Sequence, residues 1–276
     1  MRQFRKVVII GTGLIGGSLA LAIKDKRLAK KVVGVSRHKK SLILAKRIGA
    51  IDEGSLKLDV VRGADLIIFA APVKAIINLA PLVAKFADKE CLVTDVGSTK
   101  EEIVACLSKV FPNYLGSHPL AGSEKRSVAN ASSGLFSGSL CILTPVKSTN
   151  RSAMQKLSML WKSLGVKLAK LSPSKHDEAL SFVSHLPHVA AFSLINSVPG
   201  EDLKFASSGL KDTTRIAASE SELWSEIFLS NKKNLLKAIG VLEKNIILIK
   251  SGILREDVKK LTSILKRAKA KRAGLS

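Results

Sequence analysis

The feature that most constrains this chain is a glycine-rich turn close to its start. An apolar run at residues 7–10 leads directly into GTGLIGGS at residues 11–18, and an apolar helical pattern follows. In such a turn Gly11 allows the tight bend, Gly13 lets the backbone approach a pyrophosphate, and Gly16 lets the helix pack closely on the strand. A glycine-rich turn can be purely structural, but strand and helix together are the context that phosphate binding requires. The sequence therefore predicts a dinucleotide-binding βαβ unit.

The rest of the chain divides into two patterns. Short apolar runs alternate with amphipathic stretches in the first part, at residues 7–10, 32–35, 66–71, 91–94 and 140–143. This alternation predicts an α/β fold, with an N-terminal Rossmann-type doubly wound sheet. Further on the pattern is helical, at residues 176–198, 223–239, 241–249 and 256–270. The long apolar faces of these helices predict an all-α C-terminal dimerisation domain, and hence a homodimer. Pro173 divides the chain into domains 1–172 and 173–276.

Composition excludes several classes of protein. The 276 residues are 46% hydrophobic and 24% charged, as in an ordinary globular protein, and no apolar run is long enough to span a membrane. Three scattered cysteines and a strand pattern close to the N-terminus indicate a reducing, cytoplasmic location. The net charge is +23, with 13 Lys and Arg against one acid in residues 1–51. Sparse aromatic residues argue against nucleic-acid binding, and we interpret the charge as a solvated surface.

The residues after the second apolar run indicate which dinucleotide binds. An NAD site would place a carboxylate there to hold the ribose hydroxyls, but the chain reads Ser36, Arg37, His38, Lys39, Lys40. A guanidinium beside a hydroxyl suits a 2′-phosphate, so we predict NADP, with NAD less favoured. The predicted cofactor-binding residues are Gly11, Gly13, Leu14, Ile15, Gly16, Ser36, Arg37, Ala71 and Ser98.

Reactive side chains gather in four further segments. These are TDVGSTK (residues 94–100), SHPLAGSEK (117–125), SHLPH (184–188) and LKDTTRIA (210–217). His185 and His188 share a helix face, but no carboxylate or thiolate stands at ligand spacing, so no metal site is predicted. Either histidine could equally be a core residue. We expect no role for His176 or His38.

In this order, the glycine turn and the four segments resemble the prephenate/arogenate dehydrogenase family of tyrosine biosynthesis, from Val7 to about Leu248. The resemblance implies a Rossmann domain, a helical dimer-forming domain and an active site between them. It implies His118 as the catalytic histidine and Ser98 as the residue that orients it. It further implies substrate contacts from Glu124, Ser184, His185, His188, Arg215 and Trp224, the last from the partner subunit in some members.

The residue types suit that chemistry on their own account. A neutral imidazole can take the hydroxyl proton of a cyclohexadienol while hydride leaves its carbinol carbon, and an arginine can bind a carboxylate at two points. Two alternatives stay open: an NADP-dependent dehydrogenase of a small β-hydroxy acid, and a non-catalytic NADP-binding module. Prephenate and arogenate differ only at the side-chain carbon. Glu124 could pair with the ammonium of arogenate or with a neighbouring cation, so the substrate also stays open.

Overall fold

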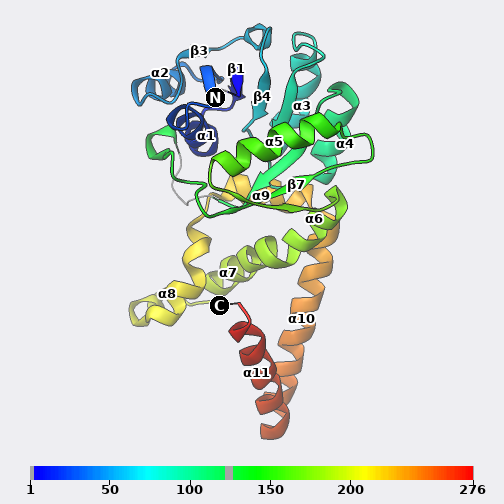
Figure 1. Cartoon of the computed structure of the whole chain (residues 1–276). Helices are drawn as coiled ribbons and strands as arrows, with labels where there is room; N and C mark the ends of the chain where they lie inside the picture. Colours follow the sequence, from blue (N-terminus) through cyan, green and yellow to red (C-terminus); the bar gives the residue numbers. More distant parts are fainter. Residues whose placement is uncertain (1–2, 122–126, 276) are drawn as a thin grey trace.

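The first strand, β1 (Phe4–Ile10), is apolar on both of its faces, and this decides the layering of the molecule. Val7 and Ile9 belong to one buried cluster, whereas Val8 and Ile10 belong to another. A strand that is buried on both faces needs a helical layer on each side. The computed structural model, which describes residues 3–121 and 127–275, has this arrangement, with helices on both faces of a parallel sheet (Figure 1).

The larger sheet has the strand order β3-β2-β1-β4-β5, and all of its pairings are parallel. The strands beside β1 are β2 (Ala29–Val35), β3 (Glu53–Ser55), β4 (Leu66–Phe69) and β5 (Leu92–Asp95). The helices that cover it are α1 (Leu14–Asp25), α2 (Lys39–Arg47), α3 (Val73–Ala84), α4 (Glu101–Val110) and α5 (Arg151–Ser163). Helices α1, α2 and α5 contribute to one buried cluster, and α3 and α4 contribute to the other.

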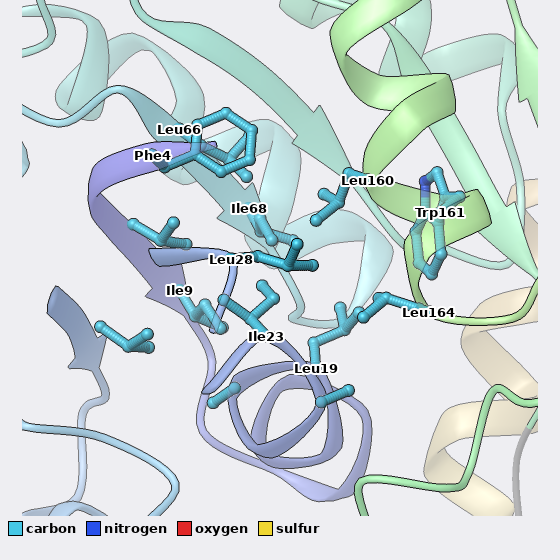
Figure 2. Packing of buried hydrophobic residues seen from close by; sticks show 14 of the residues in the cluster. Phe4, Ile9, Leu19, Ile23, Leu28, Leu66, Ile68, Leu160, Trp161 and Leu164 are labelled. Carbon is cyan, nitrogen blue, oxygen red and sulfur yellow. The ribbon is translucent and has the colours of Figure 1, made fainter. Parts of the chain in front are cut away.

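Packing between α1 and α5 closes one face of this sheet. Figure 2 shows Leu19 and Ile23 of α1 directed toward Leu160 of α5 and Leu164, the residue that follows α5, and all four side chains are buried. Trp161 is 1% exposed and packs its ring edge-on against Phe136, with 5.8 Å between the ring centres. The glycine turn at the start of α1 is therefore held on a rigid support.

A second, three-stranded sheet continues from the edge of the first. Its strands are β6 (Gly116–Pro119), β7 (Leu140–Thr144) and β8 (Lys167–Lys170), with β6 antiparallel and β8 parallel to β7. The backbone of Val93 in β5 bonds to Asn113 and Leu115, just before β6 begins. This link brings β6 alongside the carboxyl end of β5.

The remaining chain is helical and extends away from the sheets (Figure 1). Its helices are α6 (Pro173–Leu180), α7 (Leu186–Asn196), α8 (Ser208–Thr214), α9 (Ser221–Ser230), α10 (Lys232–Leu254) and α11 (Val258–Ala273). A π-helical turn, Ser181–His185, joins α6 to α7. No helix within residues 3–121 and 127–275 is both long and apolar enough to cross a lipid bilayer.

The structure corrects the predicted helix limits. The stretch predicted as one helix at 223–239 is two, because Asn231 leaves helical geometry with φ −119° and ψ 29°. The break expected near residue 240 is absent: α10 runs through Gly240, where open space surrounds the backbone. Helix 176–198 is interrupted by the π-helical turn, which precedes Pro187, a residue with no N–H to donate.

The glycine turn yields a paired prediction. A methyl group at position 16 would overlap the carbonyl oxygen of Gly11, whereas one at position 13 meets no atom within 4 Å. We expect Gly16→Ala to lower the free energy of unfolding by about 1–3 kcal/mol, because α1 must shift from the strand. Gly13→Ala should cost no more than about 1 kcal/mol, as an N-cap change. Urea unfolding without cofactor measures both, and equal losses would contradict this packing argument.

Candidate functional site

The glycine turn has the geometry of a phosphate-binding loop. Gly11 has φ +106°, a value that favours glycine, and its N–H donates to the carbonyl of Val35 at 2.8 Å. A side chain there would overlap the backbone of Ala70 and crowd Ala71. Three segments thus meet at the carboxyl ends of β1, β2 and β4, where open α/β sheets bind their ligands.

The start of α1 is suited to an anion. Helix α1 begins at Leu14, which Ile15 follows. No side chain caps the helix, and its first turn contains no acid. Gly13, the residue before it, faces open space. The Thr12 hydroxyl is buried and has no partner in the part of the chain that the structure describes. Free N–H groups and a positive helix end favour negative charge, so these residues fit the pyrophosphate of a dinucleotide.

The end of β2 carries the residues predicted to choose the dinucleotide. Ser36 is half-buried, and its hydroxyl accepts a hydrogen bond from the backbone N–H of His38 at 3.2 Å. Arg37 is exposed, next to this turn. Asp52, the residue before β3, is engaged by Lys24 and the N–H of Val32.

The loop after β5 is built around a buried ion pair. Asp95 and Lys100 are both fully buried, and the Lys100 ammonium donates to Oδ2 of Asp95. Oδ2 also accepts the N–H of Gly97 at 2.8 Å, and Oδ1 accepts the Tyr114 hydroxyl at 2.7 Å. Burial raises the pKa of Tyr114 well above its usual value, so this hydroxyl keeps its proton and donates. Ser98 lies half-buried between the two charged residues in the sequence.

His118 lies in β6, on the strand that the ion-pair loop supports. Ser117 donates to the carbonyl of Asp95 at 2.6 Å, which ties β6 to the end of β5. The ring of His118 is hydrogen-bonded through Nδ1 to Nε2 of His176 at 2.9 Å. Burial, and then the charges of His176, Lys100 and His185, hold the pKa of His118 well below its usual value. The imidazole is therefore neutral near pH 7.

His176, which the sequence gave no reason to select, is part of this site. It lies in α6, fully buried, between His118 and the carboxylate of Asp177, whose Oδ1 is 2.7 Å from Nδ1 of His176. Burial lowers its pKa as well. The adjacent His and Asp were visible in the sequence, but 58 positions separate His176 from His118, so only the fold brings them together.

The two predicted helix histidines face a tryptophan. Trp224 of α9 stacks on His188, with 3.3 Å between the ring centres, and meets His185 edge-on at 6.1 Å. These contacts lie within one chain. Asn231 donates to Nδ1 of His185, and burial lowers the pKa of His185 to about 4. Nδ1 of His188 is 3.0 Å from the carbonyl of Ser184, and burial lowers the pKa of His188.

Two of the other predicted substrate residues, Arg215 and Ser184, lie in turns of the helical part. Arg215 is exposed, in a 3₁₀ turn (Arg215–Ala218) that packs against α7. Ser184 is half-buried in the π-helical turn. Glu124 lies outside the described residues. Among the described residues, no three His, Cys, Asp or Glu side chains are grouped as metal ligands would be.

Fold and site together define a Rossmann-type dinucleotide-binding protein with a helical second domain and a hydrogen-bonded histidine pair near the carboxyl end of β5. Comparison with known families makes this specific. Residues 19–170 match the nucleotide-binding domain of prephenate dehydrogenase, and residues 172–267 match its dimerization domain. The chain belongs to the prephenate dehydrogenase family.

Individual proteins agree with this assignment. The prephenate dehydrogenase of Bacillus subtilis is 35% identical over 287 residues, covering 100% of this chain and 77% of its own length. A crystal structure of prephenate dehydrogenase from A. aeolicus with hydroxyphenyl propionate and NAD+ has a TM-score of 0.93 and 34% identity, covering 99% of this chain and 98% of its own. Synechocystis arogenate dehydrogenase has a TM-score of 0.85 and 27% identity, with 98% and 100% covered.

Proposed function

We propose that this protein oxidatively decarboxylates prephenate or arogenate, with NADP as the preferred hydride acceptor and His118 as the base. The observation that carries the proposal is a neutral imidazole, His118, anchored through Nδ1 on a strand tied to the carboxyl end of β5, in a chain of this family. The names of the relatives, prephenate dehydrogenase and arogenate dehydrogenase, support the substrate class. The bound NAD+ in the A. aeolicus enzyme supports a nicotinamide cofactor.

The proton balance of this reaction suits one imidazole. A nicotinamide dinucleotide held at the glycine turn by Gly11, Gly13 and Gly16 would supply the acceptor for the hydride of the carbinol carbon. His118 takes the hydroxyl proton as that carbon becomes a carbonyl. Loss of CO₂ leaves an electron pair that makes the ring aromatic and places negative charge on the same oxygen, which takes a proton back. The imidazole is thus neutral again at the end of the reaction. The gain in aromaticity drives the reaction.

The helical residues supply the rest of the site in this proposal. His185 and His188, held by Asn231 and Ser184, line the substrate with Trp224 as an aromatic wall. Arg215, beside α7, binds a substrate carboxylate at two points, and Ser98 orients the hydroxyl toward His118. Glu124 is the residue that would meet the side-chain end, where prephenate and arogenate differ.

A homodimer is part of the same proposal. Apolar side chains remain exposed along α10 of a single chain, including Ile253 at 62% and Leu254 at 74%. Apolar patches of this kind mark interfaces, and the matched family domain is named for dimerization. Light scattering in solution tests this directly. A monomer at all concentrations would remove the dimer from the proposal.

The substrate is tested by following the absorbance of reduced nicotinamide with prephenate and arogenate side by side. If neither is oxidised with NADP or NAD, the proposal is wrong. A β-hydroxy acid panel in the same assay tests the alternative dehydrogenase.

His118→Asn should lower kcat by at least about 100-fold, because the variant lacks the proton acceptor. Fluorescence titration should show cofactor affinity changed by less than about twofold. A variant with near-normal kcat would take His118 out of the mechanism.

The pH dependence follows from the lowered pKa of His118. A base works only when it is deprotonated, so activity falls as pH drops through that pKa, which lies below the usual 6.5. We therefore expect kcat/KM to be level across pH 6.5–8, with its acidic limb below that range. A midpoint at or above 6.5 would contradict the buried, neutral imidazole.

Cofactor choice is tested at Arg37. Removing a guanidinium that binds a 2′-phosphate should cost about 1.5–3 kcal/mol, so Arg37→Ala should raise KM for NADP by at least about tenfold. KM for NAD should stay within about twofold. Lys46→Ala, which removes an exposed charge from α2, the helix that follows Arg37, is the matched control and should change neither value. A lower KM for NAD than for NADP in the unaltered protein would overturn the preference.

A further inference from the structure

A chain of hydrogen bonds leads from His118 into the protein and ends at Asp177. One carboxylate oxygen of Asp177 accepts the backbone N–H of Lys100 at 2.8 Å, and the other accepts that of Glu101 at 2.9 Å. The first oxygen is also 2.7 Å from Nδ1 of His176. A carboxylate can only accept hydrogen bonds, so Nδ1 of His176 must carry a hydrogen and donate it.

This donated hydrogen determines which ring nitrogens of His176 and His118 carry a hydrogen. A neutral imidazole has one N–H and one lone pair, so Nε2 of His176 is an acceptor. Nε2 of His176 is 2.9 Å from Nδ1 of His118, which must therefore carry a hydrogen. The lone pair of His118 is then on Nε2, the nitrogen that faces away from the chain.

We propose that Asp177 and His176 are positioning residues that fix His118 in the tautomer whose Nε2 accepts the substrate proton. The proposal rests on the proposed function of the site and names the atom that does its chemistry. The hydrogen bond of one ring nitrogen sets the protonation of the other, so this arrangement settles the base before substrate arrives.

The same chain stabilises the charged state of the base. When Nε2 of His118 takes a proton, its positive charge is shared through His176 with the carboxylate of Asp177. The chain does not release that proton, because His176 is fully buried and Asp177 is 1% exposed. Positioning and charge stabilisation are thus its functions, and the proton leaves from His118 itself.

The arrangement also makes the base depend on how the two parts of the chain are joined. His118 lies in the second sheet, whereas His176 and Asp177 lie in α6, the first helix of the helical part. The Asp177 carboxylate reaches the sheet-bearing part by capping α4. His118 therefore receives its fixed tautomer only when α6 is docked on α4.

The test compares two substitutions of His176. Phenylalanine keeps a ring but offers no acceptor, so His176→Phe should lower kcat by about 100-fold, with KM values within about threefold of the original. Glutamine can place its carbonyl oxygen near the position of Nε2, so His176→Gln should recover kcat to within about tenfold of the original. Ser181→Ala, which removes a buried hydroxyl bonded to the Glu178 carbonyl, is the matched control and should leave kcat unchanged.

The second readout is the tautomer of His118, which would not change if His176 had only a structural role. Nitrogen-15 NMR of the ring should show hydrogen on Nδ1 of His118 in the original protein, with the signals assigned by their loss in His118→Asn. His176→Phe should show a mixture of tautomers. The other groups around His118, namely Asp95, Lys100, Cys141 and His185, are unchanged in these variants.

The outcomes separate this proposal from the proposed function. Hydrogen on Nε2 of His118 in the original protein overturns it, and so does a folded His176→Phe variant with full kcat. If His176→Phe does not fold, as judged by circular dichroism and cofactor binding, the NMR result on the original protein decides. If the protein oxidises neither prephenate nor arogenate, the proposed function fails, and the tautomer is still read by NMR.

Discussion

The carboxylate of Asp177 is the interaction on which the rest of the site depends. It accepts two backbone N–H groups at the start of α4 and a ring nitrogen of His176. The first pair stabilises a helix end, where negative charge is favoured, and fastens α6 to the sheet-bearing part. The third bond orients the imidazole chain that reaches His118. One side chain thus joins the two parts of the molecule and sets the chemistry between them.

The cofactor loop depends on a different kind of constraint, one that is entirely local. Gly11 needs its positive φ and Gly16 needs its lack of a side chain because strand, turn and helix are packed within a few residues of each other. This is why the sequence alone predicted the loop. The same holds for the apolar runs at 7–10, 32–35, 66–71, 91–94 and 140–143, each of which overlaps a strand, because they are mostly buried and therefore recognisable.

Prediction from the sequence failed for the features that tertiary contacts determine. Strands β3, β6 and β8 have no apolar run, because they lie at sheet edges, and none of them was predicted. Asn231 ends α9 because its side chain bonds to Asp177 and His185, contacts that no local pattern reveals. His176 was dismissed for the same reason. Its neighbours in the sequence predicted only a helix start, and its partner His118 becomes adjacent only when the second sheet forms.

Burial is the first reason that His118, the proposed base, remains neutral, and the buried pair of Asp95 and Lys100 adds to it. A buried ion pair is weak evidence for stability, since an apolar replacement is often as stable or more so. Its value here is electrostatic. The ammonium of Lys100 disfavours a second positive charge nearby and so lowers the pKa of His118. The ammonium can stay buried because it donates to Asp95, whose other oxygen accepts the Tyr114 hydroxyl. The carboxylate of Asp177 opposes this effect from the far end of the imidazole chain. His118 is therefore held neutral at rest, yet its charged form has a carboxylate within reach through His176, which is the balance that the proposed role requires of a base that must take a proton and give it back.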